Sequence, residues 1–241
     1  MKWRLINNDA DNAFRNMAVD EALLQSIVPV LRFYSWKPKA VSIGYFQSLD
    51  AEVDTKACKA RDIDVVRRIT GGGAVFHDQE LTYSVICPEE LFSFDILESY
   101  QQICGFIVKG LKKYGLDAKF VPINDITIKG KKISGNAQSR KQGKIIQHGT
   151  ILLDVDADEM FKVLKVPDEK MKEKMIKNIK ERVTSLSSFG PVDTKKLKQN
   201  IISAFDDFGI SFKEDKLKIE EETRVMVLED KFRSFEWNNK R

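Results

Sequence analysis

Residues 67–78 read Arg-Arg-Ile-Thr-Gly-Gly-Gly-Ala-Val-Phe-His-Asp, and no other stretch of the 241-residue chain constrains the backbone as strongly. Glycine loses more conformational freedom on folding than any other residue, so three in succession favour a place where the backbone closely approaches another group. Two arginines precede the glycines, whose backbone N–H groups are unshielded. This combination suits an anionic ligand such as a phosphate or a carboxylate, although a tight turn between two strands explains the glycines alone equally well.

The residues around the glycines predict strands on both sides. Residues 64–69 centre on Val65 and Val66, and residues 74–87 place Leu81, Tyr83 and Val85 on one face with a period of two. A P-loop or a dinucleotide-binding loop must open a helix, and no helix follows here. Both of those folds are therefore excluded.

The rest of the chain alternates between helical and strand patterns. Strands dominate the first two-thirds and helices the last third, which predicts one α+β domain over residues 1–241, with a mixed β-sheet core flanked by helices. The expected helices cover residues 10–27, 51–61 and 96–114, with most of the chain after residue 158; the expected strands cover residues 30–36, 40–46, 210–212 and several segments within 118–155.

Bulk composition describes an ordinary globular protein. Forty basic and thirty-six acidic side chains give a net charge of +4, which is too even for a dedicated nucleic-acid binder. No signal peptide and no membrane-spanning segment are recognisable, so we expect a cytoplasmic protein without a membrane partner. Residues 168–182 form an amphipathic pattern, for which a solvated helix and a partner-docking helix both remain open.

The three cysteines, Cys58, Cys87 and Cys104, do not indicate a reactive site. Their number is odd, no two are close in sequence, and the two histidines do not complete a zinc-ligand pattern with them. We expect buried, inert thiols.

A second informative segment is Lys132-Ile-Ser-Gly-Asn-Ala-Gln, which places a lysine on a predicted strand with small residues after it. Small residues leave room for a ligand against the backbone, and the lysine supplies a point charge. Taken alone, this pattern also fits a surface lysine on an edge strand. The pair Asn124-Asp125 precedes it at a distance that a hairpin can close.

Together the two segments resemble the lipoate–protein ligase family. Four blocks follow one another in the order of that family's pattern, and weaker similarities extend the resemblance over nearly the whole chain. The blocks are residues 67–78, 124–125, 132–137 and 148–150, and the weaker similarities are residues 16–23, 36, 42–47, 182–186 and 236–238. The resemblance implies a catalytic domain of the biotin/lipoate ligase type.

The resemblance also implies a reaction, in which lipoate and ATP with Mg²⁺ give lipoyl-AMP, and the lipoyl group then passes to a lysine of a carrier domain. Lys132 would be catalytic. The residues implied in ATP or lipoyl-AMP binding are Arg68, Gly73, Ala74, Val75, Phe76, Asn124, Asp125 and Lys132; those implied in lipoyl binding are Gly72, His77, Ser134, Gly135, Ala137, His148 and Thr150; and Asp125 is the candidate for Mg²⁺. Cationic side chains and backbone N–H groups fit this chemistry because a carboxylate must meet a triphosphate.

The implied macromolecular substrates are lipoyl carrier domains, of the 2-oxoacid dehydrogenase E2 type or the glycine cleavage H protein type. Many family members continue into a small accessory domain, whereas this sequence stops at Arg241. We therefore expect a separate protein to supply the accessory domain.

Two alternatives remain beside the ATP-dependent ligase. Octanoyl or lipoyl transferases of the same superfamily work through a cysteine thioester, but neither position where such enzymes carry the cysteine holds one here. A non-catalytic lipoate-binding protein would keep the cavity without turnover. A biotin ligase would be expected to show a Gly-Arg-Gly-Arg-like loop instead of residues 71–76.

Overall fold

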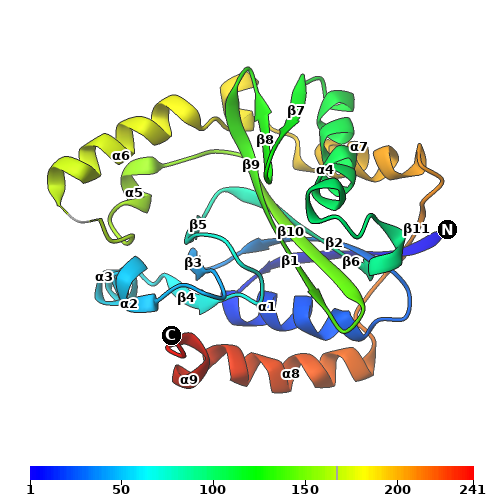
Figure 1. Ribbon diagram of the computed structural model, residues 1–241, viewed down its shortest axis with the longest axis horizontal. Helices are drawn as coiled ribbons and strands as arrows, with labels where there is room; N and C mark the ends of the chain where they lie inside the picture. The colour runs from blue at the N-terminus through cyan, green and yellow to red at the C-terminus, as the bar shows by residue number, and fades with distance from the viewer. Residues whose placement is uncertain (167) are drawn as a thin grey trace.

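The computed structural model describes residues 1–166 and 168–241, and its centre is an eight-stranded sheet (Figure 1). Strand β1 pairs in parallel with its two neighbours, while every pairing from the third strand to the far edge is antiparallel. The sheet is therefore mixed. Its order is β11 (Ser211–Asp215), β1 (Lys2–Asp11), β2 (Val30–Trp36), β6 (Glu80–Pro88), β10 (Lys144–Leu152), β9 (Lys131–Lys141), β8 (Asp125–Ile128) and β7 (Ala118–Val121).

A smaller sheet of three strands holds the ends of the glycine loop. Strand β3 (Ala40–Ile43) lies in its centre, parallel to β4 (Asp64–Arg67) and antiparallel to β5 (Val75–His77). Because β4 and β5 flank β3, the chain between them must cross from one edge of this sheet to the other. The triple glycine lies in that crossing.

Helices cover both faces of the large sheet. Helices α4 (Ile96–Lys113) and α7 (Thr194–Asp206) pack on one face, and α1 (Ala13–Ala22) and α8 (Ile219–Arg233) lie on the other (Figure 1). The remaining helices are α2 (Leu49–Glu52) and α3 (Thr55–Ala60) beside the small sheet, α5 (Ala157–Met160) and α6 (Glu169–Arg182) in a projecting arm, and α9 (Phe235–Asn238); short 3₁₀ turns are η1 (Leu23–Gln25), η2 (Glu89–Leu91) and η3 (Leu186–Phe189).

Sequence signals explain where the long helix α4 begins and ends. The Asp95 side chain accepts a hydrogen bond from the Glu98 backbone N–H, which satisfies a donor that the first turn leaves free. Gly115, with φ of +105°, allows the chain to reverse after the last turn. The sequence predicts this helix over residues 96–114, and the structure ends it one residue earlier, at Lys113.

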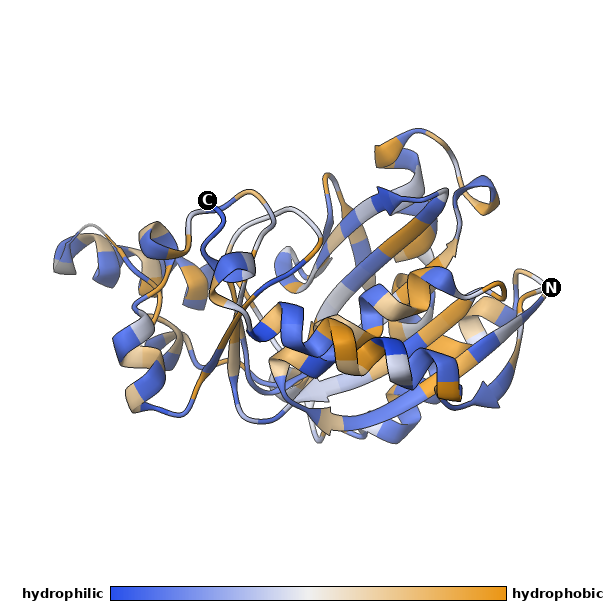
Figure 2. Cartoon of the chain, turned by 90° about the horizontal axis from the view of Figure 1, so that it is seen from below, coloured by the Kyte–Doolittle hydropathy of each residue, from blue (hydrophilic) through white to orange (hydrophobic). Residues whose placement is uncertain are grey.

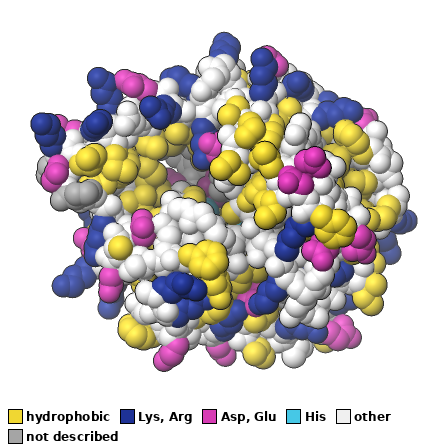
Figure 3. All heavy atoms as spheres, in the orientation of Figure 1, with side chains coloured by type: hydrophobic (Ala, Val, Ile, Leu, Met, Phe, Trp, Pro, Cys, Tyr) yellow, Lys and Arg dark blue, Asp and Glu magenta, His cyan; other side chains and the backbone are white. Residues whose placement is uncertain are grey.

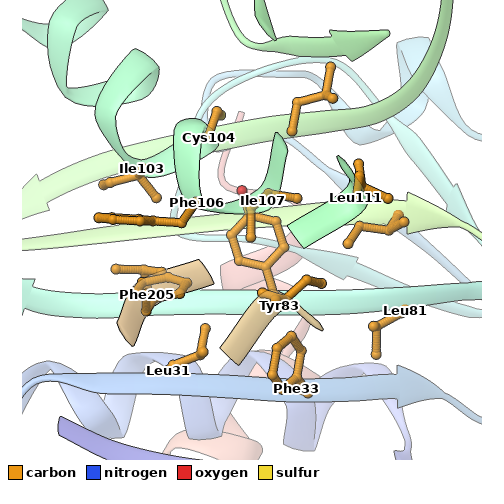
Figure 4. Close-up of a cluster of buried hydrophobic side chains, with 14 of the residues drawn as sticks. Leu31, Phe33, Leu81, Tyr83, Ile103, Cys104, Phe106, Ile107, Leu111 and Phe205 are labelled. Atoms are coloured by element: carbon orange, nitrogen blue, oxygen red, sulfur yellow. The ribbon is translucent and has the colours of Figure 1, made fainter. Parts of the chain in front are cut away.

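The main core lies between the large sheet and α4 with α7. Alternate residues of β2 and β6, including Phe33 and Tyr83, point toward Ile107 of α4 and Phe205 of α7 (Figure 4). In Figure 2 both the strands and the helices mix hydrophilic and hydrophobic residues, as expected of elements with one buried and one more polar face. A second core joins the opposite face of the sheet to α1 and α8.

The prediction of a mixed sheet flanked by helices is confirmed, and the differences are local. Residues 51–61 form two short helices instead of one, because Val53 leaves the helix to form a β-bridge with Leu164. Residues 74–87 form two strands that belong to different sheets, separated at residues 78–79. No helix among the described residues is long and apolar enough to cross a membrane.

The contact between α4 and α7 yields a test of the main core. A Cβ atom at Gly110 would lie 2.7 Å from the Cα atom of Ile201, so Gly110→Ala forces the helices apart. We expect overpacking to cost about 1–3 kcal/mol, against a helix-propensity gain of about 1 kcal/mol. Urea unfolding should show a net loss of stability.

Gly105 of the same helix is the matched control, since no atom lies within 4 Å of its Cβ position. Gly105→Ala should leave stability unchanged or raise it by up to about 1 kcal/mol. Equal unfolding midpoints for the two variants would contradict the close packing of α4 on α7.

Candidate functional site

A cavity of about 350 Å³ lies between the two sheets, on the face of the large sheet that carries α1. Figure 3 shows a hollow at this place, bordered by the α5–α6 arm. This volume is within the range of small-molecule sites. The predicted site residues that line it are Arg68, Gly72, Gly73, Ala74, Val75, Phe76, His77, Asn124, Lys132, Gly135, Ala137, His148 and Thr150.

The glycine loop is held against the end of β3 by a close backbone approach. A Cβ atom at Gly44 would lie 1.9 Å from the carbonyl oxygen of Gly72, so Gly44 must be glycine. Gly72 itself has φ of +96°, a conformation that other residues rarely adopt. Gly73 has no atom within 4 Å of its Cβ position and faces the cavity, so its missing side chain leaves space for a ligand.

Two buried arginines donate hydrogen bonds to backbone carbonyl groups here, Arg67 to the segment after β3 and Arg68 to the glycine loop. Arg67 donates to the carbonyl oxygens of Gly44 (3.2 Å), Tyr45 (3.0 Å) and Gln47 (2.6 Å), and Nη2 of Arg68 donates to those of Gly71 (2.7 Å) and Gly73 (2.8 Å). Each guanidinium group therefore braces the backbone.

Neither arginine forms an ion pair within the part of the chain that the structure describes. Burial lowers the pKa of Arg68 to about 10, which still leaves it charged at neutral pH. Arg68 also lines the cavity and supplies a positive potential there, although the carboxylates of Asp78, Glu80, Asp154 and Asp156 line the same space. The loop is therefore suited to a ligand with negative charge or a polarised carbonyl group.

A β-bulge positions Lys132. Between β8 and β9 the register shifts, so that Thr127 opposes Lys132 while Ile126 opposes Ser134. The extra residue places Lys132 and Gly135 on the same face, and a Cβ atom at Gly135 would lie 3.0 Å from Nζ of Lys132. The lysine chain therefore lies along the bare backbone of Gly135, at the cavity.

The same bulge determines where Ser134 lies. Ser134 lies opposite Ile126 and Ile151, two members of the main core, and its fully buried hydroxyl does not line the cavity. Strict alternation along β9 would have placed Ser134 on the same face as Lys132. Ser134 is therefore not among the residues that line this cavity, and its assignment to lipoyl binding stays a prediction.

Asp125 is the ion-pair partner of Lys132. Its Oδ1 lies 2.6 Å from Nζ of Lys132, and both side chains are partly exposed. No group of three or more His, Cys, Asp or Glu side chains gathers within the described residues. Asp125 is thus in direct contact with Lys132, and its assignment to Mg²⁺ stays a prediction.

His77 belongs to a buried hydrogen-bonded chain at the inner wall of the cavity. Its Nδ1 lies 2.8 Å from Oε1 of Glu80, and its Nε2 lies 2.7 Å from the hydroxyl of Ser42. The ring stacks on Trp36 with centroids 3.9 Å apart. Because Arg68 donates to the Ser42 hydroxyl (3.2 Å), the chain connects Glu80 to the support of the glycine loop.

His148 is held in a second buried network. Its Nε2 lies 2.7 Å from the hydroxyl of Thr70, and its Nδ1 lies 3.3 Å from Oδ2 of Asp20. Burial lowers the pKa of His148, so it is neutral at pH 7. Burial alone would raise the pKa of Asp20, but the Arg32 charge at 2.7 Å and its hydrogen bonds bring that pKa below the usual range.

The outer wall of the cavity comes from the α5–α6 arm, which the sequence analysis did not assign to the site. Met160, Ile179 and Val183 supply apolar surface to it. The segment that follows the arm is joined to β9 because the backbone N–H of Thr184 donates to the carbonyl of Lys132 (2.8 Å). Other lining residues that were missed are Met17, Tyr34, Trp36, Ser42, Asp78, Gln79, Glu80, Thr82, Asn136, Gly149, Leu152, Asp154, Val155 and Asp156.

No cysteine lines this cavity. Burial raises the pKa of Cys58 to about 11 and those of Cys87 and Cys104 to about 12. All three are buried and unpaired with one another. At neutral pH they are thiols, which are poor nucleophiles.

A mixed sheet that holds a lysine opposite a glycine-rich loop is the catalytic-domain fold of biotin and lipoate ligases, and a biotin protein ligase from Aquifex aeolicus shares the fold with a TM-score of 0.51 at 15% identity. The family model of the lipoyl protein ligase A/B catalytic domain matches residues 12–206, and the chain belongs to this family.

Its sequence relatives are transferases by name. The chain is 36% identical to "Octanoyltransferase LipM" of Clostridioides difficile, with 100% of this chain and 99% of that protein covered. It is 34% identical to the protein of the same name from Bacillus subtilis, with 99% of this chain and 98% of that protein covered.

Similar solved structures bear ligase names. A bi-partite lipoate protein ligase of Thermoplasma acidophilum, described with its E2 lipoyl domain, has a TM-score of 0.92 at 35% identity, covering 99% of this chain and 96% of that one. A putative lipoate protein ligase of the same organism with bound lipoic acid has a TM-score of 0.83 at 31% identity, with 99% of each chain covered. A lipoate–protein ligase A bound with ATP has a TM-score of 0.85 at 32% identity, with 99% of this chain and 98% of that chain covered.

The interpretation as an ATP-dependent lipoate–protein ligase is corrected by the sequence relatives, which are octanoyltransferases. Ligase and transferase both need a cavity for the acyl chain and a cation for its carbonyl group, so the glycine loop and Lys132 do not separate them. The chain is an enzyme of the lipoate and octanoate family, and the transferase alternative fits its relatives better.

Gly73 yields a test of the cavity that does not depend on the reaction. Gly73→Ala adds a methyl group that meets no atom of the protein but occupies ligand space, so affinity for lipoic or octanoic acid should fall about tenfold or more while the unfolding midpoint stays constant. Isothermal titration calorimetry measures the affinity for the acid, and urea unfolding measures the midpoint.

Gly71→Ala is the control, because its Cβ position is equally open and Gly71 does not line the cavity. Its affinity for both acids should match that of the unmodified chain. Equal losses in the two variants would mean that loop flexibility, not ligand space, explains the effect.

Proposed function

We propose that the chain transfers an octanoyl or lipoyl group from a thioester donor to a lysine of a lipoyl carrier domain. The observation that carries the proposal is Lys132, a cation held beside Asp125 at an apolar cavity. A free carboxylate and an amine do not condense in water, so the donor must already be activated.

The apolar lining favours a medium-length acyl chain over a polar substrate. Trp36, Leu152, Met160 and Ile179 come from different parts of the fold and surround the same space. Small-molecule sites of this kind are largely apolar, with a few polar groups that fix orientation. The acyl chain would occupy this space with its carbonyl group at Lys132.

Lys132 would stabilise the negative charge that develops on the acyl oxygen. In the transfer, the amine nitrogen forms a bond to the acyl carbon, the carbon–sulfur bond breaks, and the proton lost by nitrogen is taken up by the departing thiolate. An ammonium group near the oxygen lowers the energy of the tetrahedral intermediate more than that of the ground state. Gly73 and Ala74 of the glycine loop line the same cavity.

We infer a direct transfer without an enzyme thioester. The three cysteines lie outside the cavity, and burial holds their pKa values well above neutral. The acyl group would thus pass from donor to acceptor in one displacement. ATP and Mg²⁺ would have no part in this step, because the thioester already carries the activation.

The acceptors we propose are carrier domains of the 2-oxoacid dehydrogenase E2 type or the glycine cleavage H protein type, in the cytoplasm. A relative described together with its E2 lipoyl domain supports the first type. A separate accessory-domain protein stays a prediction of the sequence.

Lys132→Ala should lower the transfer rate about a hundred- to a thousand-fold, because it removes a donor that acts on the developing charge. Acylation of an apo lipoyl domain by an octanoyl thioester, followed by mass spectrometry, measures this effect. Lys119→Ala is the control, since that lysine is exposed on β7 of the same sheet.

The same assay tests the donor. Transfer from the octanoyl thioester should proceed without ATP. Acylation that occurs only with free octanoate or lipoate together with ATP and Mg²⁺ would overturn the proposal.

A variant with Cys58, Cys87 and Cys104 all replaced by alanine should transfer at a rate within about threefold of the unmodified chain, once its folding is verified by circular dichroism. The reason is that no thiol lines the cavity. Loss of transfer together with a trapped octanoyl adduct on one of these cysteines in the unmodified chain would contradict the direct route.

A further inference from the structure

A second depression, of about 400 Å³, adjoins the acyl cavity on its arm side and is not used by the proposed reaction. The two hollows share Val155 and Val183, so they lie next to each other. Its other lining residues are Ile128, Lys129, Lys131, Lys180, Thr184, Ser188 and Phe189. We call this depression the basic groove.

The basic groove combines an apolar surface with three cations. Lys129 lies over the ring of Phe189, with Nζ 5.8 Å from the centroid, and Nζ of Lys131 lies 3.4 Å from the carbonyl oxygen of Lys180. Lys180 is paired with Asp158 at 2.6 Å. Within the described part of the chain, Lys129 and Lys131 form no ion pair, so the groove carries an excess of positive charge.

The positive charge extends along α6, whose sequence holds five lysines and one arginine against three glutamates. In Figure 3 dark-blue side chains border the upper left of the molecule, where Figure 1 places α6. A surface of this kind attracts an acidic protein and speeds its encounter.

The basic groove also borders Lys132, where the proposed transfer takes place. Val183, which lines both hollows, forms a β-bridge with Lys132, and the N–H of Thr184 donates to the Lys132 carbonyl. A side chain that extends from the groove past Val183 therefore arrives at Lys132. An acyl chain in the cavity would have its carbonyl group at that point.

We propose that the basic groove docks the acceptor protein, through an acidic hairpin that presents its target lysine; this inference rests on the proposed acyl transfer. Acidic side chains beside the target lysine would pair with Lys129 and Lys131. The target amine must lose its proton before it attacks, and nearby cations disfavour the ammonium form, so the groove favours the reactive amine. The acyl donor enters through the cavity instead.

The test compares a large and a small acceptor. An apo lipoyl domain of net negative charge should need the groove, while hydroxylamine reaches the acyl group without docking. In the double variant Lys129→Glu/Lys131→Glu, the ratio of kcat/KM for the domain to kcat/KM for hydroxylamine should fall at least tenfold. The fall should diminish as ionic strength rises, because salt screens exposed charges.

Lys216→Glu makes a matched charge reversal at the far edge of the sheet, beyond β11, and should leave the ratio unchanged. An unchanged ratio in the double variant, or an equal fall in Lys216→Glu, would overturn the docking proposal. So would a rise in KM for the octanoyl thioester alone, which would assign the groove to the donor.

Calorimetric titration of the chain with the same apo domain separates this inference from the proposed reaction. If the unmodified chain binds the domain and the double variant binds at least tenfold more weakly, the docking surface stands even without turnover. If the two bind equally, the docking surface is rejected even with turnover.

Discussion

The site depends on two buried guanidinium groups that have only backbone carbonyls and one hydroxyl as partners. Arg68 holds the glycine loop, Arg67 holds the adjoining segment of residues 44–47, and neither meets a carboxylate among the described residues. Burying a charge without a counter-ion is costly, and the several carbonyl dipoles offset that cost. The loop is fixed because the carbonyls of Gly71 and Gly73 accept hydrogen bonds from Arg68. The space beside the Cα atom of Gly73 stays open for the ligand.

The sequence predicted the parts of the fold in which local pattern and tertiary structure agree. Helix α4 combines an aspartate cap, an apolar stripe and a closing glycine, and strand β2 was predicted with its observed bounds. The misplaced features depend on contacts distant in sequence, such as the bridge between Val53 and Leu164. The bulge that turns Ser134 into the core is of the same kind, because a one-residue shift leaves no mark in composition.

The position of the site was predictable from two local patterns in the sequence. A lysine beside small residues and a triple glycine indicated a ligand, and the structure brings them to one cavity. The arm from α5 to α6 was missed because an amphipathic helix looks the same whether it covers a cavity or faces solvent. The reaction class was predicted wrongly because the four blocks that resemble lipoate–protein ligases hold and polarise an acyl group, which an octanoyltransferase must also do.

The C-terminal helix α9 has a role in this site that its distance in sequence conceals. The backbone N–H of Arg67 donates to Oδ1 of Asn238 at 2.7 Å, and its guanidinium group donates to the Asn238 and Trp237 carbonyls. These partners are 170 and 171 residues apart along the chain. During synthesis the glycine loop is thus made long before α9, so a ribosome-bound chain that ends before residue 237 would have the loop and its Arg68 contacts but would leave Arg67 without these partners.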